Sequence, residues 1–72
     1  MISYNPFWHT LSAKEISQYE LLRYYRLSAG TLDSIRRMRG ISTRTIDRLC
    51  SILGCNVSDI IVYVPDQVQD VS

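Results

Sequence analysis

Long apolar runs are missing from this chain of 72 residues. The longest uninterrupted run, 60–64, is far shorter than the roughly 20 residues that a membrane-spanning helix requires. The first residues show no basic region followed by an apolar stretch, so we expect no signal peptide. These absences favour a cytoplasmic protein that does not contact a membrane.

Cysteine is scarce, with only Cys50 and Cys55. A structural zinc site needs about four ligands, and the other good candidate, His9, is distant in sequence. Two such thiols stay free in a reducing compartment. We therefore expect no metal, and we interpret both cysteines as small buried apolar residues on or just after a helix.

Patterns that signal catalysis are also missing. The chain has no glycine-rich phosphate loop, no nucleophile elbow and no paired carboxylates, and His9 has no nucleophile or carboxylate at catalytic spacing. A helical chain of this length also offers little concave surface for a ligand. We predict that the protein is not an enzyme and takes no cofactor or small-molecule substrate.

The net charge is only +1, but the charges are unevenly distributed. Five arginines lie within 36–48, a stretch with one acidic residue, Asp47. The segment 54–72 has three aspartates and no base. Ordinary surface arginines on a solvated helix would explain the basic stretch 36–48 if it stood alone. The basic stretch and the acidic segment 54–72 together predict a molecule with a basic side and an acidic end.

Apolar spacing and polar cap residues predict five short helices in one small domain. The expected helix starts are Asn5, Ser17, Ser28, Ser42, and Asn56 or Ser58. The expected apolar positions are Phe7, Trp8, Leu11, Leu21, Leu22, Tyr25, Leu32, Ile35, Ile46, Leu49, Ile52, Leu53, Ile60 and Ile61. Gly54 should end the fourth helix in a left-handed conformation, and Pro65 should stop the fifth.

The expected fold is therefore all-α, with a domain over 1–65 and a flexible tail at 66–72. One alternative concerns the two ends of the domain. Alternation at Ile2 and Tyr4, and again at Val62 and Val64, also allows a small terminal β-pair.

The segment 17–38 holds two capped helical patterns joined by a connector that is long enough only for a turn. Ser17 and Glu20 have the spacing of a capping box. Arg26 and Leu27 make the corner, and Ser28 caps the second helix, about 28–38. This arrangement is typical of a helix-turn-helix, whose second helix lies in the DNA major groove.

The chain resembles the small regulators of the Cro/CI-type (lambda-repressor-like, XRE) helix-turn-helix family. The motifs that carry the resemblance are NPFW at 5–8, ISTRTIDRLC at 41–50 and DIIVYVP at 59–65. Two positions depart from the pattern, because Arg26 holds a corner where glycine is common and Leu22 a position where a small residue is common. The resemblance implies a compact five-helix domain that binds operator-like double-stranded DNA, usually as a dimer.

Helical phasing then selects the side chains that would read bases. With Leu32 and Ile35 turned inward, a step of about 100° per residue leaves the opposite face of the helix at 28–38 exposed. We expect DNA contacts from this face and from the first turn, at Ser28, Ala29, Gly30, Thr31, Asp33, Ser34 and Arg37. Arg37 is the strongest candidate, because a guanidinium can bond O6 and N7 of guanine together. Asp33 either accepts from cytosine N4 or holds Arg37 four residues on, and we favour the second role.

Phosphate contacts are expected from helix starts and nearby arginines. The resemblance implies a backbone contact from Gln18, which otherwise reads as an ordinary exposed helix former. The start of the fourth helix adds amides, hydroxyls and positive charge, at Arg39, Ser42, Thr43 and Arg44. Arg36 falls nearer the buried side, where its stem would run along the core.

These observations favour a sequence-specific regulator of transcription, either repressor or activator. One small module makes few base contacts, so we expect a homodimer across two half-sites, joined through the apolar segment 60–64. A second interpretation is a protein-interaction module of antitoxin or anti-repressor type, which would keep the fold and hold a partner through its acidic, apolar C-terminal end.

Overall fold

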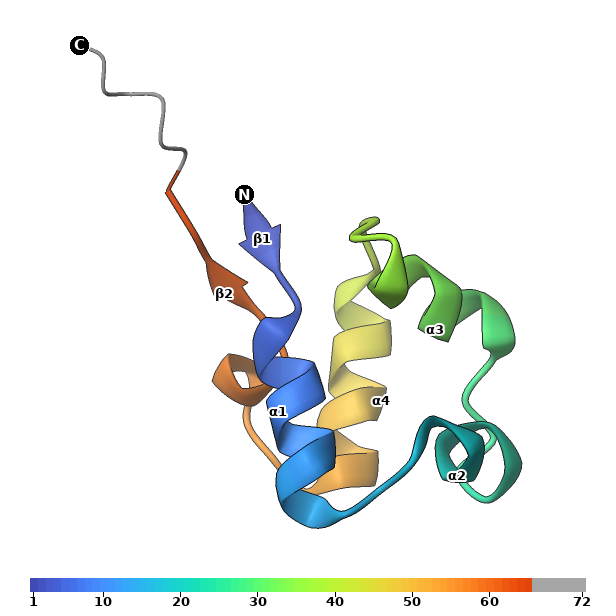
Figure 1. The fold of residues 1–72 in the computed structure, drawn as a ribbon. Coiled ribbons are helices and arrows are strands. Elements are labelled where there is room, and N and C mark those ends of the chain that lie inside the picture. The colour runs from blue at the N-terminus through green and yellow to red at the C-terminus, as the bar shows by residue number, and fades with distance from the viewer. Residues whose placement is uncertain (66–72) are drawn as a thin grey trace, which may run out of the picture.

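The computed structural model describes residues 1–65, so the flexible tail expected at 66–72 lies outside the described residues. The elements in chain order are β1 (Ile2–Ser3), α1 (Asn5–Lys14), α2 (Gln18–Arg23), α3 (Ala29–Arg36), α4 (Thr43–Leu53), the 3-10 turn η1 (Val57–Asp59) and β2 (Val62–Tyr63). In Figure 1, α1 and α4 occupy the centre, α2 and α3 the right-hand side and the strands the upper left. The predicted helical fold is confirmed.

The fifth helix is the main departure from the prediction. Only the 3-10 turn η1 forms, and the chain then enters β2, which pairs antiparallel with β1 in the register Ile2–Tyr63 and Ser3–Val62. The Val64 amide also donates to the Met1 carbonyl at 2.7 Å. β-Branched and aromatic residues favour such pairing over helix, so the terminal β-pair left open by the sequence is present.

Three serines begin the helices as expected. The hydroxyl oxygens of Ser17, Ser28 and Ser42 each accept a backbone N–H three residues on, at 3.1 Å in every case. The capping box at Ser17 is complete, because the Glu20 carboxylate accepts the Ser17 amide at 2.9 Å. These bonds satisfy N–H groups that have no partner within the helix.

The start of α1 lies one residue earlier than predicted. Tyr4, not Asn5, is at the N-cap position, and it makes no side-chain cap bond. The hydroxyl of Ser3 accepts the Asn5 amide at 3.2 Å instead. Asn5 therefore belongs to the first turn, with Pro6 directly after it.

One cluster of buried side chains joins all the helices. Its members are Tyr4, Phe7, Leu11, Leu21, Leu27, Leu32, Ile35, Leu49, Leu53 and Ile60. Tyr4 is 3% exposed, although the sequence pattern did not place it in the core, whereas Leu22 and Tyr25 are 38% and 40% exposed. The prediction of a core position was wrong for both. Tyr25 lies beyond the end of α2 at Arg23, so helical spacing no longer applies to it, and Leu22 lies on the exposed side of this helix.

Three helices end through the same backbone arrangement. A left-handed residue follows α1, α3 and α4 at Glu15, Met38 and Gly54, and the next amide donates to the carbonyl five residues earlier. Gly54 at the end of α4 confirms the prediction made for it. The left-handed Met38 also explains why α3 stops at Arg36, short of the expected residue 38.

The corner between α2 and α3 contains a fourth left-handed residue, Arg26, with φ 57°. A Cβ disfavours this conformation, and glycine adopts it freely. Arg26→Gly is therefore expected to raise the free energy of unfolding by about 1 kcal/mol. The substitution relieves backbone strain in the folded protein, and this gain exceeds the cost of the conformational entropy that glycine adds to the unfolded chain. Chemical denaturation measures the change.

Arg26→Ala is the matched control, since it removes the same charge but keeps the Cβ. Equal stability of the two variants would contradict the assignment of backbone strain to this corner.

Candidate nucleic-acid interface

Helix α3 presents a solvent-facing side that is most exposed at its start. Ser28, Ala29 and Gly30 are exposed, whereas Thr31, Asp33 and Ser34 are half-buried. The Ser28 hydroxyl donates to Thr31 Oγ1 at 2.8 Å while it accepts the Thr31 amide, so the cap is fixed. A Cβ at Gly30 would meet no atom within 4 Å. Packing within the chain therefore does not require glycine there.

Arg37 lies at the C-cap of α3, but its charged group lies back over the helix. Its Nε donates to Oδ1 of Asp33 at 3.1 Å, which is the pairing that we favoured from their spacing. The Arg37 side chain nevertheless remains 62% exposed. Asp33 thus holds an accessible guanidinium over α3 with donors left for a ligand.

Arg36, whose stem was expected to run along the core, is exposed, and its guanidinium contacts the start of α2. Its Nε and Nη2 donate to Oε1 of Gln18 at 3.1 and 2.6 Å. Gln18 is exposed as well. Helical phasing alone gave no indication of this contact between two helices.

The link between α3 and α4 carries the next group of predicted contacts. The Tyr4 hydroxyl donates to the Arg39 carbonyl at 2.6 Å, which ties this link to the N-terminal segment. Ser42 caps α4, and Thr43 and Arg44 form its exposed first turn. The Ser42 hydroxyl is engaged by Thr45 through both its amide and its Oγ1, at 3.1 and 3.0 Å. Thr43 is therefore the freer hydroxyl of the pair.

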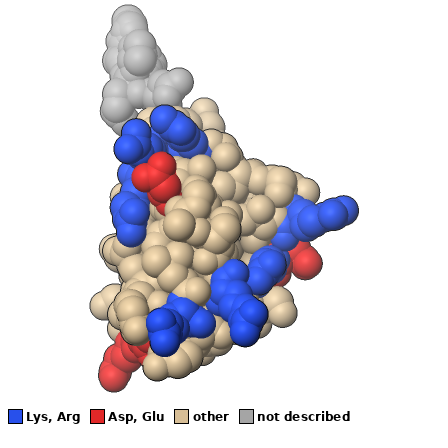
Figure 2. Space-filling view, turned by 90° about the vertical axis from the view of Figure 1, so that its right-hand side faces the viewer, with Lys and Arg blue, Asp and Glu red and all other residues tan. Residues whose placement is uncertain are grey.

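Basic side chains lie in several places on the side formed by α2 and α3. Figure 2 views the molecule from this side and shows Lys and Arg in separate groups with neutral surface between them. A few acidic side chains lie beside these groups. The arrangement can attract a polyanion although the net charge is only +1.

Two residues important to this surface were not selected from the sequence. Arg36 carries a charge that Gln18 holds in place, and Tyr4 fixes the backbone at Arg39. The sequence offers only a weak indication for Tyr4, because its alternation with Ile2 suggested a terminal strand and no other role. No pattern in the sequence indicates the pairing of Gln18 with Arg36.

Within residues 1–65, no three His, Cys, Asp or Glu side chains are grouped so that they could hold a metal ion. None of the helices described is long and apolar enough to cross a membrane.

Comparison with known proteins agrees with this geometry. A family model described as Cro/C1-type HTH DNA-binding domain matches residues 7–66. The crystal structure of the transcriptional regulator VanUg (Form II) is similar in fold, with a TM-score of 0.80 and 26% sequence identity. That match covers 90% of this chain and 87% of the other. No curated protein sequence matches this chain.

Proposed function

The chain belongs to the family of Cro/C1-type HTH DNA-binding domains, and we propose that it regulates transcription by reading a specific double-stranded DNA site with α3. The observation that carries the proposal is the exposed face of α3, whose guanidinium at Arg37 is held ready by Asp33. The similarity to a structure described as a transcriptional regulator supports the regulatory role. The role we propose is binding, without catalysis.

Base reading is assigned to α3. Arg37 would donate to O6 and N7 of a guanine, the contact that arginine makes most often in the major groove. Around it, Ser34 and Thr31 would bond base edges, and the methyl groups of Thr31 and Ala29 would meet thymine methyls. Gly30 and the cap Ser28 let the backbone of the first turn approach the DNA.

Phosphate contacts are assigned to two places that flank α3. At one, the linked side chains of Gln18 and Arg36 keep unused N–H donors for a phosphate. At the other lie the exposed basic residues and the open first turn of α4, at Arg39, Ser42, Thr43 and Arg44. Contacts of this kind position a protein on DNA without reading its sequence.

A homodimer is proposed through the strands at the two ends of the domain. Ile60 was included in the expected dimer segment, but it is fully buried in the core. Val62, Tyr63 and Val64 are each at least 40% exposed, and Ile2 on the paired strand is 45% exposed. An exposed apolar two-stranded sheet offers both surface and edges to a second copy.

Selection from a pool of random double-stranded DNA, followed by sequencing of the bound DNA, tests whether the protein recognises a specific DNA sequence. We expect enrichment of a palindromic site, because two α3 helices of a dimer would read two half-sites about one helical turn apart. The double variant Arg37→Ala, Ser34→Ala should lose this enrichment. Lys14→Ala removes the same charge from α1 and should keep it.

Selection should be run at low and moderate salt, since phosphate contacts weaken as salt rises. No enrichment at either salt from a folded protein would contradict the proposal. It would favour the interpretation as a protein-interaction module.

The role of the Gln18–Arg36 pair can be measured from the salt dependence of affinity. Arg36→Ala should weaken binding to all sequences alike and reduce the slope of log K against log salt by about one, because one phosphate contact is lost. Gln18→Ala should weaken binding less and leave the slope unchanged, because the charge of Arg36 remains. An unchanged slope in Arg36→Ala would show that this arginine does not contact phosphate.

The dimer face is tested by sedimentation with Val62→Asp. An aspartate on this face would place two carboxylates in an apolar contact, so we expect the dimer to dissociate while circular dichroism stays unchanged. Leu22→Asp, at an exposed apolar position on α2, is the matched control and should remain dimeric. A dimer unaffected by Val62→Asp, or a monomer in the unaltered protein, would refute this face.

A further inference from the structure

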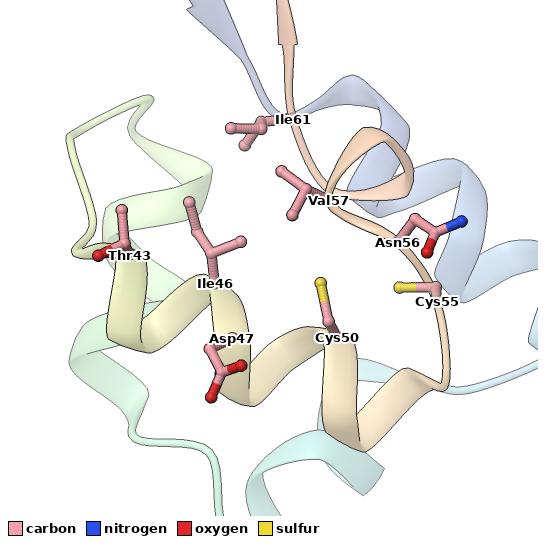
Figure 3. A pocket seen from close by; sticks show the side chains of 8 residues that line it. All are labelled: Thr43, Ile46, Asp47, Cys50, Cys55, Asn56, Val57 and Ile61. Carbon is pink, nitrogen blue, oxygen red and sulfur yellow. The ribbon is translucent and has the colours of Figure 1, made fainter.

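Two thiols lie together in the wall of a cavity that no residue of α3 lines, although the cavity shares Thr43 with the proposed phosphate contacts. The cavity has a volume of about 410 Å³ and is lined by Thr43, Ile46, Asp47, Cys50, Cys55, Asn56, Val57 and Ile61. Figure 3 shows the Cys50 side chain rising from α4 into this space, with the thiol of Cys55 pointing toward it from the following loop. Both cysteines are free and half-buried.

The turn that ends α4 brings these two side chains together. The Cys55 amide donates to the Cys50 carbonyl at 3.1 Å, across the left-handed Gly54. In this type of helix end, the two residues joined by that bond commonly make a side-chain contact. The Cys50 thiol is also among the groups that raise the pKa of the Cys55 thiol.

The end of α1 provides an internal comparison. There the Ile16 amide donates to the Leu11 carbonyl at 3.0 Å, across the left-handed Glu15. Leu11 is buried in the core, and Ile16 packs against the same core. At α4 the two equivalent positions both hold cysteine, so a pair that could be purely apolar is chemically reactive instead.

We propose that Cys50 and Cys55 are a thiol–disulfide site, which hydrogen peroxide closes into an intramolecular disulfide. One thiolate attacks a peroxide oxygen, the O–O bond breaks, and a sulfenic acid forms as hydroxide leaves and takes up a proton to give water. The second thiol then attacks the sulfenic sulfur, the S–O bond breaks and a second water leaves. Two electrons pass from the two sulfurs to the peroxide, and the S–S bond forms.

The surroundings of Cys55 govern how readily the site reacts. Burial raises the pKa of the Cys55 thiol, and the neighbouring Cys50 and Asp59 raise it further, while Lys14 opposes them. The thiolate is the reactive species, so a raised pKa lowers its fraction at neutral pH. Attack by the Cys55 thiolate should therefore be slow at neutral pH and accelerate as the pH rises.

A disulfide here would tie the last turn of α4 to the segment that enters η1. It would also join two of the side chains that line the cavity. The bond would change this wall without contacting the exposed face of α3. The site is thus separate from the residues proposed to read DNA, and its test does not depend on DNA binding.

Mass spectrometry of the reduced, folded protein treated with hydrogen peroxide tests the proposal. We expect a monomeric product that has lost two hydrogen atoms, resists alkylation and returns to the starting mass with dithiothreitol. Peptide mapping should show Cys50 linked to Cys55. The rate of formation should be independent of protein concentration over a tenfold range, because the reaction is intramolecular.

Cys50→Ser and Cys55→Ser are matched controls, and neither should give the alkylation-resistant monomer. Disulfide-linked dimers as the main product, formed faster at higher protein concentration, would overturn the proposal. Sulfinic or sulfonic acids at the two cysteines without a cross-link would overturn it too.

Discussion

The fold depends on one core that all of its short helices share. Helices α2 and α3 have six and eight residues, whereas an isolated helix shorter than about 12 residues is marginal in water. Each is held by very few buried side chains, which for α3 are Leu32 and Ile35. These two are at most 1% exposed, so they fix the rotation of α3 and thereby decide which of its residues face solvent. The exposed face proposed to read DNA is a direct result of that burial.

Polar contacts at the surface then set the positions of particular side chains and loops. Asp33 holds Arg37, Gln18 holds Arg36, and the Tyr4 hydroxyl holds the backbone at Arg39. An exposed ion pair such as Asp33–Arg37 contributes little to the free energy of unfolding, and we infer that it serves to keep the guanidinium in place for a ligand. The cavity beside Cys50 and Cys55 lies against α4 and η1, and no residue of α3 lines it.

Much of the fold could be predicted because its signals are local. The caps at Ser17, Ser28 and Ser42 and the left-handed Gly54 depend on a few adjacent residues, and all four positions are confirmed. The errors occur where distant segments decide the structure. Pairing with β1 converts the expected fifth helix into η1 and β2, the burial of Tyr4 depends on how the N-terminal segment packs, and the contact of Arg36 with Gln18 joins residues on two helices. Helical spacing identified the exposed face of α3, but spacing carries no information about which side chain would reach across to α2.

We propose that α3 and its flanking residues form the DNA-contacting surface of this protein. A titration of isotope-labelled protein with a short duplex, followed by nuclear magnetic resonance of the backbone amides, is the measurement that tests this surface. We expect the largest shift changes on residues 28–37, with smaller ones at Gln18 and at 42–44, and we expect them to diminish as salt is raised. Changes concentrated on α4, η1 and β2, with α3 unaffected, would contradict this proposal.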